Sequence, residues 1–224
     1  MEKKIKYKEL LNFTKKILKK AGLCPFSTEA VSVGLCETSL RGVESHGIRL
    51  LKHYVDSAIY GRKNPKPKFK FIKSFPSIST LDANNAFGHA AGFKAIDHSI
   101  KIAKKNGISL VAVKNSSHPG AMASMALRAA RKGLACFAFT HADSLMLSHN
   151  SKRAYFGTNP ICFAIPREER EPYCLDMATT MISWNKLLIY RGKNKKLNDY
   201  FAATKTGQKT KNPKKANSLI GAGD

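Results

Sequence analysis

The sequence lacks any apolar run of about 18 residues, the length that a helix needs to cross a bilayer. Its first residues are basic, but neither an apolar core nor a small-residue cleavage site of the secretory kind follows them. With 43% hydrophobic residues, the chain has enough apolar side chains to fold around a core. We therefore expect a soluble, cytoplasmic protein that does not associate with a membrane.

Cysteine is sparse and irregularly spaced. The 224 residues contain five cysteines, and no two of them form a CxxC pair. The seven histidines do not form an HExxH motif, and no cluster of His, Cys and Asp has the spacing of metal ligands. We expect reduced, structural thiols and no metal site.

Acidic residues are few, since 15 Asp and Glu stand against 39 Lys and Arg, a formal net charge of +24. The excess is densest near the ends: residues 1–20 hold eight lysines, and residues 186–215 hold ten basic residues against the single Asp199. Such charge permits non-specific binding to polyanions. However, zinc-finger spacing, an RRM aromatic signature and a basic helix with heptads are all absent. We expect a lysine-rich solvated surface and no specific nucleic-acid partner.

The generic motifs of nucleotide and hydrolase sites are also absent. No GxGxxG follows a predicted strand, and neither a GxxxxGK[ST] phosphate loop nor a GxSxG elbow occurs. These motifs therefore leave the function open.

Apolar periodicity predicts a helical front end followed by alternating strands and helices. Helices are expected over 7–21, over 27–39 with Ser27 as its cap, and over 46–59. Strands are expected over 69–72, 77–81, 108–113, 134–139, 162–165 and 173–175. Further helices are expected over 90–105 and 120–132, which makes the stretch 90–140 a βαβ pattern. The runs 108–113 and 134–139 are continuously apolar, which is typical of strands buried on both faces. The predicted fold class is α/β (α+β).

Two histidines lie in surroundings suited to acid–base chemistry. His46 lies between Ser45 and Gly47, with Arg41 and Arg49 nearby, so it could hold a proton beside an anion that an arginine grips. The alternative is a polar turn that caps a helix. His118 follows a predicted buried strand, the position at which open α/β sheets bind ligands, although a structural turn would also fit there.

Four stretches, taken together, resemble the malate/L-lactate dehydrogenase family, which includes ureidoglycolate, sulfolactate and diketogulonate dehydrogenases. The stretches are Arg41-Gly-Val-Glu-Ser-His-Gly47 with Tyr54, Gly88-His-Ala-Ala-Gly92, Asn115-Ser-Ser-His118 with Gly120, and Gly157-Thr-Asn-Pro160 followed by Leu175-Asp-Met-Ala-Thr179. They occur in the order and at the spacing of the family across nearly all of residues 5–220. The chain differs from many members at Leu50, where they carry arginine, and has its arginine at position 49.

The resemblance implies hydride transfer between NAD or NADP and a small 2-oxo or 2-hydroxy acid, in a homodimer whose cofactor domain is not a Rossmann fold. It implies that His46 or His118 is the acid/base. It implies substrate contacts from Arg41, Ser45, Arg49 and Tyr54. It implies cofactor contacts from Asp143, Gly157, Thr158, Asn159, Pro160, Asp176, Met177 and Ala178.

The resemblance also implies a domain organisation. Residues 1–75 would form a helical substrate domain, residues 76–190 a mixed-sheet NAD(P)-binding domain, and residues 191–224 a basic polar loop or frayed end. Members of the family continue beyond the point that corresponds to residue 224, so we expect exposed apolar surface and marginal stability for this chain alone. A catalytically silent fragment whose basic ends bind polyanions is therefore the alternative function.

Overall fold

The computed structural model describes residues 4–223, which divide into two compact units. The first unit comprises residues 4–136 and 163–174, and the second comprises residues 137–162 and 175–223. Among the described residues, no helix combines the length and the apolar character that a membrane span requires.

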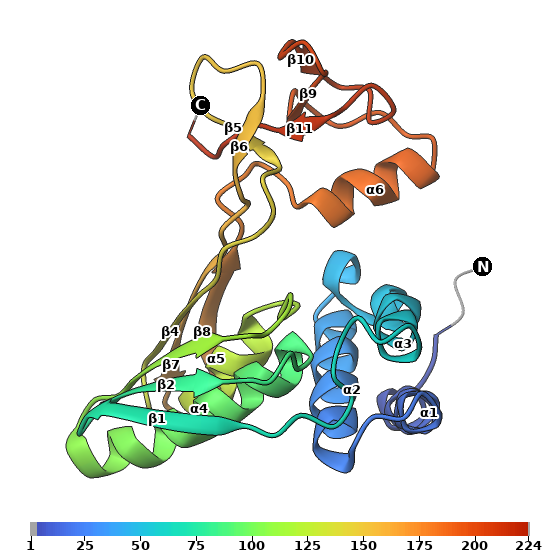
Figure 1. The fold of residues 1–224 in the computed structure, drawn as a ribbon. Coiled ribbons are helices and arrows are strands. Elements are labelled where there is room, and N and C mark those ends of the chain that lie inside the picture. Colours follow the sequence, from blue (N-terminus) through green and yellow to red (C-terminus); the bar gives the residue numbers. More distant parts are fainter. Residues whose placement is uncertain (1–3, 224) are drawn as a thin grey trace. The chain divides into compact units, whose positions relative to one another are not determined.

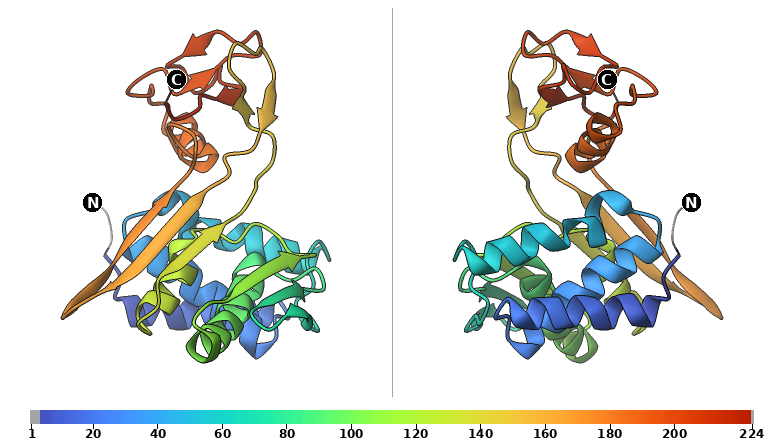
Figure 2. Two further views of the ribbon diagram at one scale, coloured as in Figure 1. Left: turned by 90° about the vertical axis from the view of Figure 1, so that its left-hand side faces the viewer. Right: turned by 90° about the vertical axis from the view of Figure 1, so that its right-hand side faces the viewer.

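The first unit begins with the expected helical front end (Figure 1). Helix α1 (Tyr7–Lys20) buries Thr14 and Leu18 against α2 (Pro25–Leu40), and Figure 2 shows the two helices from opposite sides. Helix α2 also packs against α4 (Gly88–Asn106) and α5 (Ala123–Ala130), so it is buried around most of its circumference. This helix begins two residues before Ser27, because Pro25 at its first position is already set to the helical φ. The prediction that Ser27 is the cap was wrong, since Cys24 holds that position.

The helix predicted over 46–59 is interrupted. Two short 3₁₀ turns, η1 (Glu44–His46) and η2 (Ile48–Leu50), precede α3 (Leu51–Ile59). Gly47 separates the two turns in an extended conformation and lies directly against the side chain of Ser39. The close contact leaves no room for a β-carbon at position 47, so the turn is fixed on the last turn of α2.

A mixed sheet follows in the first unit, with strand order β1-β2-β3. Strands β1 (Lys70–Phe75) and β2 (Ile78–Asp82) form an antiparallel hairpin, and β3 (Leu110–Lys114) runs parallel to β2. Helix α4 (Gly88–Asn106) connects β2 to the parallel β3, so a βαβ unit spans residues 78–114, and α4 packs against β3 and α5 (Ala123–Ala130). The βαβ unit predicted within 90–140 was wrong, because the strand at 136–139 belongs to a different sheet from β3. The mixed α/β fold class is confirmed.

The burial predicted for two strands was wrong. Leu110 in β3 is 57% exposed, and Phe137 and Phe139 in β4 (Cys136–Phe139) are 62% and 64% exposed. Continuous apolar, β-branched sequence is compatible with a strand covered on one face as well as on two. The pattern alone therefore could not decide how much of each strand is covered.

Strand β4 forms a second sheet with β7 (Ile161–Arg167) and β8 (Arg170–Met177), in the order β4-β7-β8. Each of these three strands has residues in both units. The two strands expected at 162–165 and 173–175 are thus present and longer than predicted.

The second unit contains a five-stranded sheet of short strands in the order β10-β9-β11-β5-β6. Its members are β5 (Met146–Leu147), β6 (Ala154–Phe156), β9 (Ala202–Ala203), β10 (Lys209–Thr210) and β11 (Ser218–Leu219). Helix α6 (Trp184–Gly192), which precedes β9 in the chain, was not predicted. Its amino end is capped by the hydroxyl of Ser183, which accepts a hydrogen bond from the Lys186 N–H.

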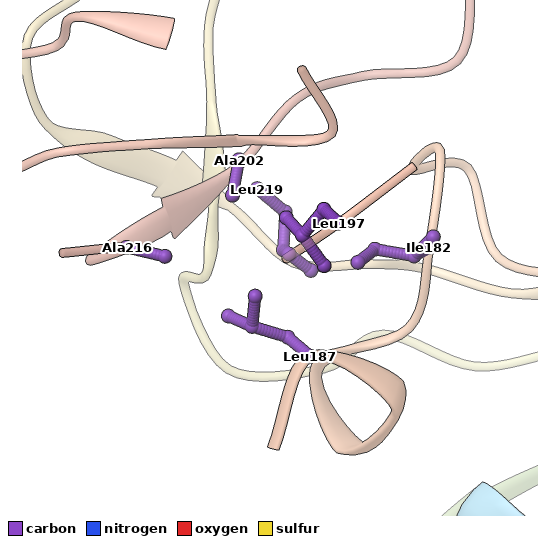
Figure 3. Packing of buried hydrophobic residues seen from close by; sticks show 6 residues of the cluster. All are labelled: Ile182, Leu187, Leu197, Ala202, Ala216 and Leu219. Carbon is purple, nitrogen blue, oxygen red and sulfur yellow. The ribbon is translucent and has the colours of Figure 1, made fainter. Parts of the chain in front are cut away.

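The region expected to be a polar loop or frayed end, residues 191–224, is ordered where the structure describes it. It contributes three strands, and its apolar residues pack with those of α6 in one buried cluster (Figure 3): Ile182, Leu187, Leu197, Ala202, Ala216 and Leu219. The few apolar side chains of this lysine-rich segment therefore pack together in the folded unit. Their spacing along the sequence is irregular, so apolar periodicity did not predict the cluster.

Candidate active site

The first part of the candidate site is a pair of histidines in the first unit. The rings of His46 and His118 are stacked, with centroids 5.4 Å apart and planes inclined by 23°. His46 ends η1, whereas His118 lies in the loop after β3, so the fold brings together two motifs that are 72 positions apart in the sequence. Both predicted acid/base candidates therefore belong to one constellation.

The loop that carries His118 is held on the start of α4. The Ser117 hydroxyl accepts a hydrogen bond from the Gly88 N–H at 3.0 Å and donates one to the Ala86 carbonyl at 3.3 Å. A β-carbon built on Gly88 would collide with the His118 carbonyl, so helix and loop approach as closely as backbones can. The His118 side chain is exposed and its Nδ1 accepts a hydrogen bond from the Gly120 N–H at 3.3 Å. In the neutral ring, this bond places the proton on Nε2.

His46 is held in a less hydrated environment. Its Nδ1 lies 2.9 Å from the hydroxyl of Ser45, and Ile48 donates its N–H to the Ser39 hydroxyl at 2.8 Å beside it. Burial, with a smaller contribution from the neighbouring His118, lowers the pKa of His46 to about 4. His46 is therefore neutral at pH 7 and can accept as well as donate a hydrogen bond.

The two arginines predicted to bind substrate differ in their surroundings. Arg41 donates a hydrogen bond to Glu171 at 2.9 Å, and Arg131 donates to the same carboxylate oxygen at 2.7 Å, which together lower the pKa of Glu171. Arg49 is exposed, and its side chain has no ion pair or hydrogen bond within residues 4–223. Of the two, Arg49 is the guanidinium available to an external carboxylate.

Tyr54, the remaining predicted substrate residue, is buried in α3. Its ring lies 6.0 Å from that of Phe87 and 5.2 Å from that of His89, measured between centroids. The hydroxyl has no hydrogen-bond partner among residues 4–223, and burial raises the pKa of Tyr54. Tyr54 is therefore an uncharged phenol at neutral pH.

His89 is a buried residue of this region to which the sequence assigned no role. It lies in the first turn of α4, fully buried, and both of its ring nitrogens lack a hydrogen-bond partner among residues 4–223. The small residues around it in Gly88-His-Ala-Ala-Gly92 were the available signal, since they allow neighbouring elements to approach closely.

The predicted cofactor residues form a second constellation, entirely within the second unit. The Thr158 carbonyl accepts hydrogen bonds from the N–H and the hydroxyl of Thr179, which follows Ala178. Asn159 accepts a hydrogen bond from the N–H of Ala142 through its Oδ1 at 3.1 Å, and a β-carbon on Gly157 would collide with the Ala142 carbonyl. Thus the segments 142–143, 157–160 and 176–179 adjoin. Asp143, Asp176 and Met177 are exposed.

Comparison with known proteins identifies the family. Residues 5–223 match the model of the malate/L-lactate dehydrogenase family. The chain is 36% identical over 203 residues to a malate dehydrogenase of Pyrococcus abyssi. The matched region covers 91% of this chain and 56% of that relative. It is 33% identical over 202 residues to the NAD(+) ureidoglycolate dehydrogenase of Escherichia coli O157:H7, covering 90% of this chain and 58% of the relative.

Solved structures agree. The crystal structure of malate dehydrogenase from Entamoeba histolytica superposes with a TM-score of 0.94 at 30% identity, over 100% of this chain and 64% of that one. Sulfolactate dehydrogenase from Methanocaldococcus jannaschii gives a TM-score of 0.87 at 28% identity, and the superposition covers 98% of this chain and 64% of that one. The chain thus spans somewhat more than half the length of the curated relatives. By the match of nearly all of its residues, the chain belongs to the malate/L-lactate dehydrogenase family.

Proposed function

We propose that this chain carries the proton-transfer, substrate-binding and cofactor-binding residues of an NAD(P)-dependent oxidoreductase of small 2-hydroxy and 2-oxo acids. When bound, the nicotinamide cofactor supplies a hydride to C2 of the 2-oxo acid and becomes NAD(P)+, and the reverse reaction returns it. The carbonyl oxygen must gain one proton in the same reaction, and this proton is what the protein provides. The stacked His46–His118 pair is the observation that carries the proposal.

His118 is the proposed proton donor. Its exposed ring accepts a backbone hydrogen bond at Nδ1, so the proton of the neutral ring is on Nε2 and can pass to a substrate oxygen. His46 is the proposed second polar contact, because its low pKa keeps it uncharged while it holds the substrate oxygen or hydroxyl.

The substrate carboxylate is proposed to bind Arg49, whose guanidinium has no partner among residues 4–223. A planar guanidinium can donate two parallel hydrogen bonds to a carboxylate. Ser45 is proposed to orient the substrate through its contact with His46, whereas the buried Tyr54 would act indirectly, through the packing of its ring against His89. Arg41 would act indirectly, by holding Glu171.

The residues of the second constellation fit a dinucleotide. Exposed carboxylates at Asp143 and Asp176 can accept hydrogen bonds from ribose hydroxyls, and Gly157 allows the Ala142 carbonyl to approach its backbone, which holds the segments together. We propose that Gly157–Pro160 and Asp176–Ala178 hold the cofactor, with NAD and NADP both open. A homodimer in the cytoplasm remains our prediction from the family resemblance, and light scattering of the purified chain tests the dimer.

The test is reduction of oxaloacetate by NADH or NADPH, followed at the nicotinamide absorbance, with cofactor binding followed by Trp184 fluorescence. Removing a general acid costs about 10²- to 10⁴-fold in rate, so His118→Asn should lower kcat by that factor and leave cofactor binding unchanged. Trp184 is the only tryptophan and packs on the buried cluster of the second unit. Wild-type turnover in both His118→Asn and His46→Asn would refute the assignment, and absent cofactor binding in the folded chain would refute the function.

A further inference from the structure

His89 lies where three elements of the first unit meet. Its ring edge touches Gly34 of α2, since a β-carbon built there would collide with Cδ2 and lie 2.7 Å from Nε2. The same edge touches Gly120, where a β-carbon would collide with Nε2 and lie 2.6 Å from Cε1. The imidazole of α4 thus fills the space between α2 and the loop that follows His118.

The contact with Gly120 leads directly to the proposed proton donor. The N–H of Gly120 is the group that donates to Nδ1 of His118. Gly120 has φ +75°, a conformation that a residue with a side chain rarely adopts, so both space and backbone geometry require glycine at this position. Any shift of the His89 ring would therefore move the N–H that fixes the His118 tautomer.

The chemistry of His89 is unexpected for a residue that only fills space. The fully buried imidazole has no hydrogen-bond partner among residues 4–223, so its burial costs the free energy of the hydrogen bonds to water that it loses. An aliphatic side chain of similar size would fill the space without this cost. Burial also lowers the pKa of His89 to about 3, with smaller contributions from His118 and His46. The ring is thus uncharged, and the centroid of the Tyr54 ring lies 5.2 Å from its own.

We propose that His89 is a positioning residue that holds the Gly120 N–H against Nδ1 of His118, and so keeps the His118 proton on Nε2, the nitrogen that faces substrate. The geometric basis is the placement of its ring between Gly34 and Gly120. The inference rests on the proposed role of His118 as proton donor.

Nitrogen-15 NMR of the histidine side chains in the wild-type chain and in His89→Ala and His89→Leu variants tests the proposal, because the shifts of the two ring nitrogens report the tautomer directly. The wild type should show His118 as the Nε2–H form. Both variants should show His118 as a mixture of tautomers and should lower kcat for oxaloacetate by about 10- to 100-fold, with cofactor binding unchanged. The matched control is His98→Ala on the same helix, whose ring stacks on Phe71 at 3.9 Å and which should leave the His118 signals in place.

A second approach reaches the same ring from another helix. Gly34→Ala should push the His89 ring and disturb the His118 tautomer, whereas Gly34→Ala combined with His89→Ala should not disturb it further, because the added methyl then occupies the space that the ring has left. This pair keeps the test decisive if one of the single variants fails to fold.

An unchanged Nε2–H tautomer of His118 in a folded His89 variant would overturn the proposal. A tautomer that shifts as expected in a chain without turnover would uphold the positioning role and refute the proposed enzymatic function. The two failures are therefore distinguishable.

Discussion

The two units differ in the kind of group that their candidate residues present, side chains in the first and mostly backbone in the second. In the first unit the candidate residues act through their side chains, namely the stacked rings of His46 and His118 and the guanidinium of Arg49, three residues after His46. In the second unit the contacts between the candidate segments are mostly made by backbone groups, as between Thr158 and Thr179. Proton transfer depends on particular titratable groups, whereas a dinucleotide can be held by backbone and a few carboxylates. Variants of the first unit should therefore change chemistry, and variants of the second should change binding or folding.

The largest effect is expected from acid on the first unit. The pKa of His46 is lowered to about 4 and that of His89 to about 3, so the unfolded chain binds these protons more readily. The stability that the two neutral rings provide is present above about pH 6.5, the unfolded value, and is lost as the pH falls from there toward the folded values. Each histidine contributes a slope of about 1.4 kcal/mol per pH unit within that window.

Urea unfolding of the first unit, followed at its own NMR signals between pH 7 and pH 4, measures this slope. His89→Leu should reduce it by about 1.4 kcal/mol per pH unit, the share of one histidine, since His46, His53 and His98 would still titrate with lowered pKa values. A free energy of unfolding that does not change over this range would show that the two rings are hydrated in solution.

The next largest effect should fall on the second unit alone. Leu187 is fully buried in the cluster of Figure 3, and truncation of such a side chain to alanine costs about 2–5 kcal/mol. Leu187→Ala should therefore lower the stability of the second unit and weaken cofactor binding, while the histidine signals of the first unit stay unchanged. Thermal melting followed at Trp184 measures the loss, and a simultaneous change of the His46 signals would show that the two units are not independent.

A smaller effect should separate the two arginines of the first unit. A hydrogen bond to a charged group contributes about 1.5–3 kcal/mol, so Arg49→Ala should raise the KM for oxaloacetate about 10- to 150-fold. Arg41→Ala breaks an exposed ion pair with Glu171 and should change the stability by less than about 1 kcal/mol, with little effect on KM. The reverse order of the two KM values would transfer the carboxylate contact to Arg41.

The smallest effect concerns the basic ends of the chain. Non-specific binding to duplex DNA should be weak and should decline with salt in proportion to the phosphates contacted. Replacing Lys19 and Lys20, or Lys195 and Lys196, by glutamine should lower the salt slope by no more than about 2 in either unit. Tight, salt-sensitive binding that does not depend on the DNA sequence, in the absence of cofactor binding, would favour the polyanion-binding alternative over the enzyme.

The sequence predicted the secondary structure where apolar residues repeat at a regular spacing, and it predicted candidate site residues where a motif is contiguous. The periodicity of α1 and α4 and the chain order of strand β2, helix α4 and strand β3 were predictable, because a helix or strand that buries one face must repeat its apolar residues at a fixed spacing. The segment after residue 191 was not, because its apolar residues are isolated among lysines and meet only in the folded unit. The exposure of Leu110 and Phe137 was also unpredictable, since it depends on what lies over each strand.

By itself, the sequence determined the family and the mixed α/β class and supplied the candidate site residues, because these follow from local patterns and from motifs a few residues long. Only the tertiary structure decided that His46 and His118 stack, that Arg41 is bound to Glu171 while Arg49 is not, and that His89 lies between Gly34 and Gly120. These outcomes depend on contacts between residues far apart along the chain, and on the burial that sets which of them can hold a charge.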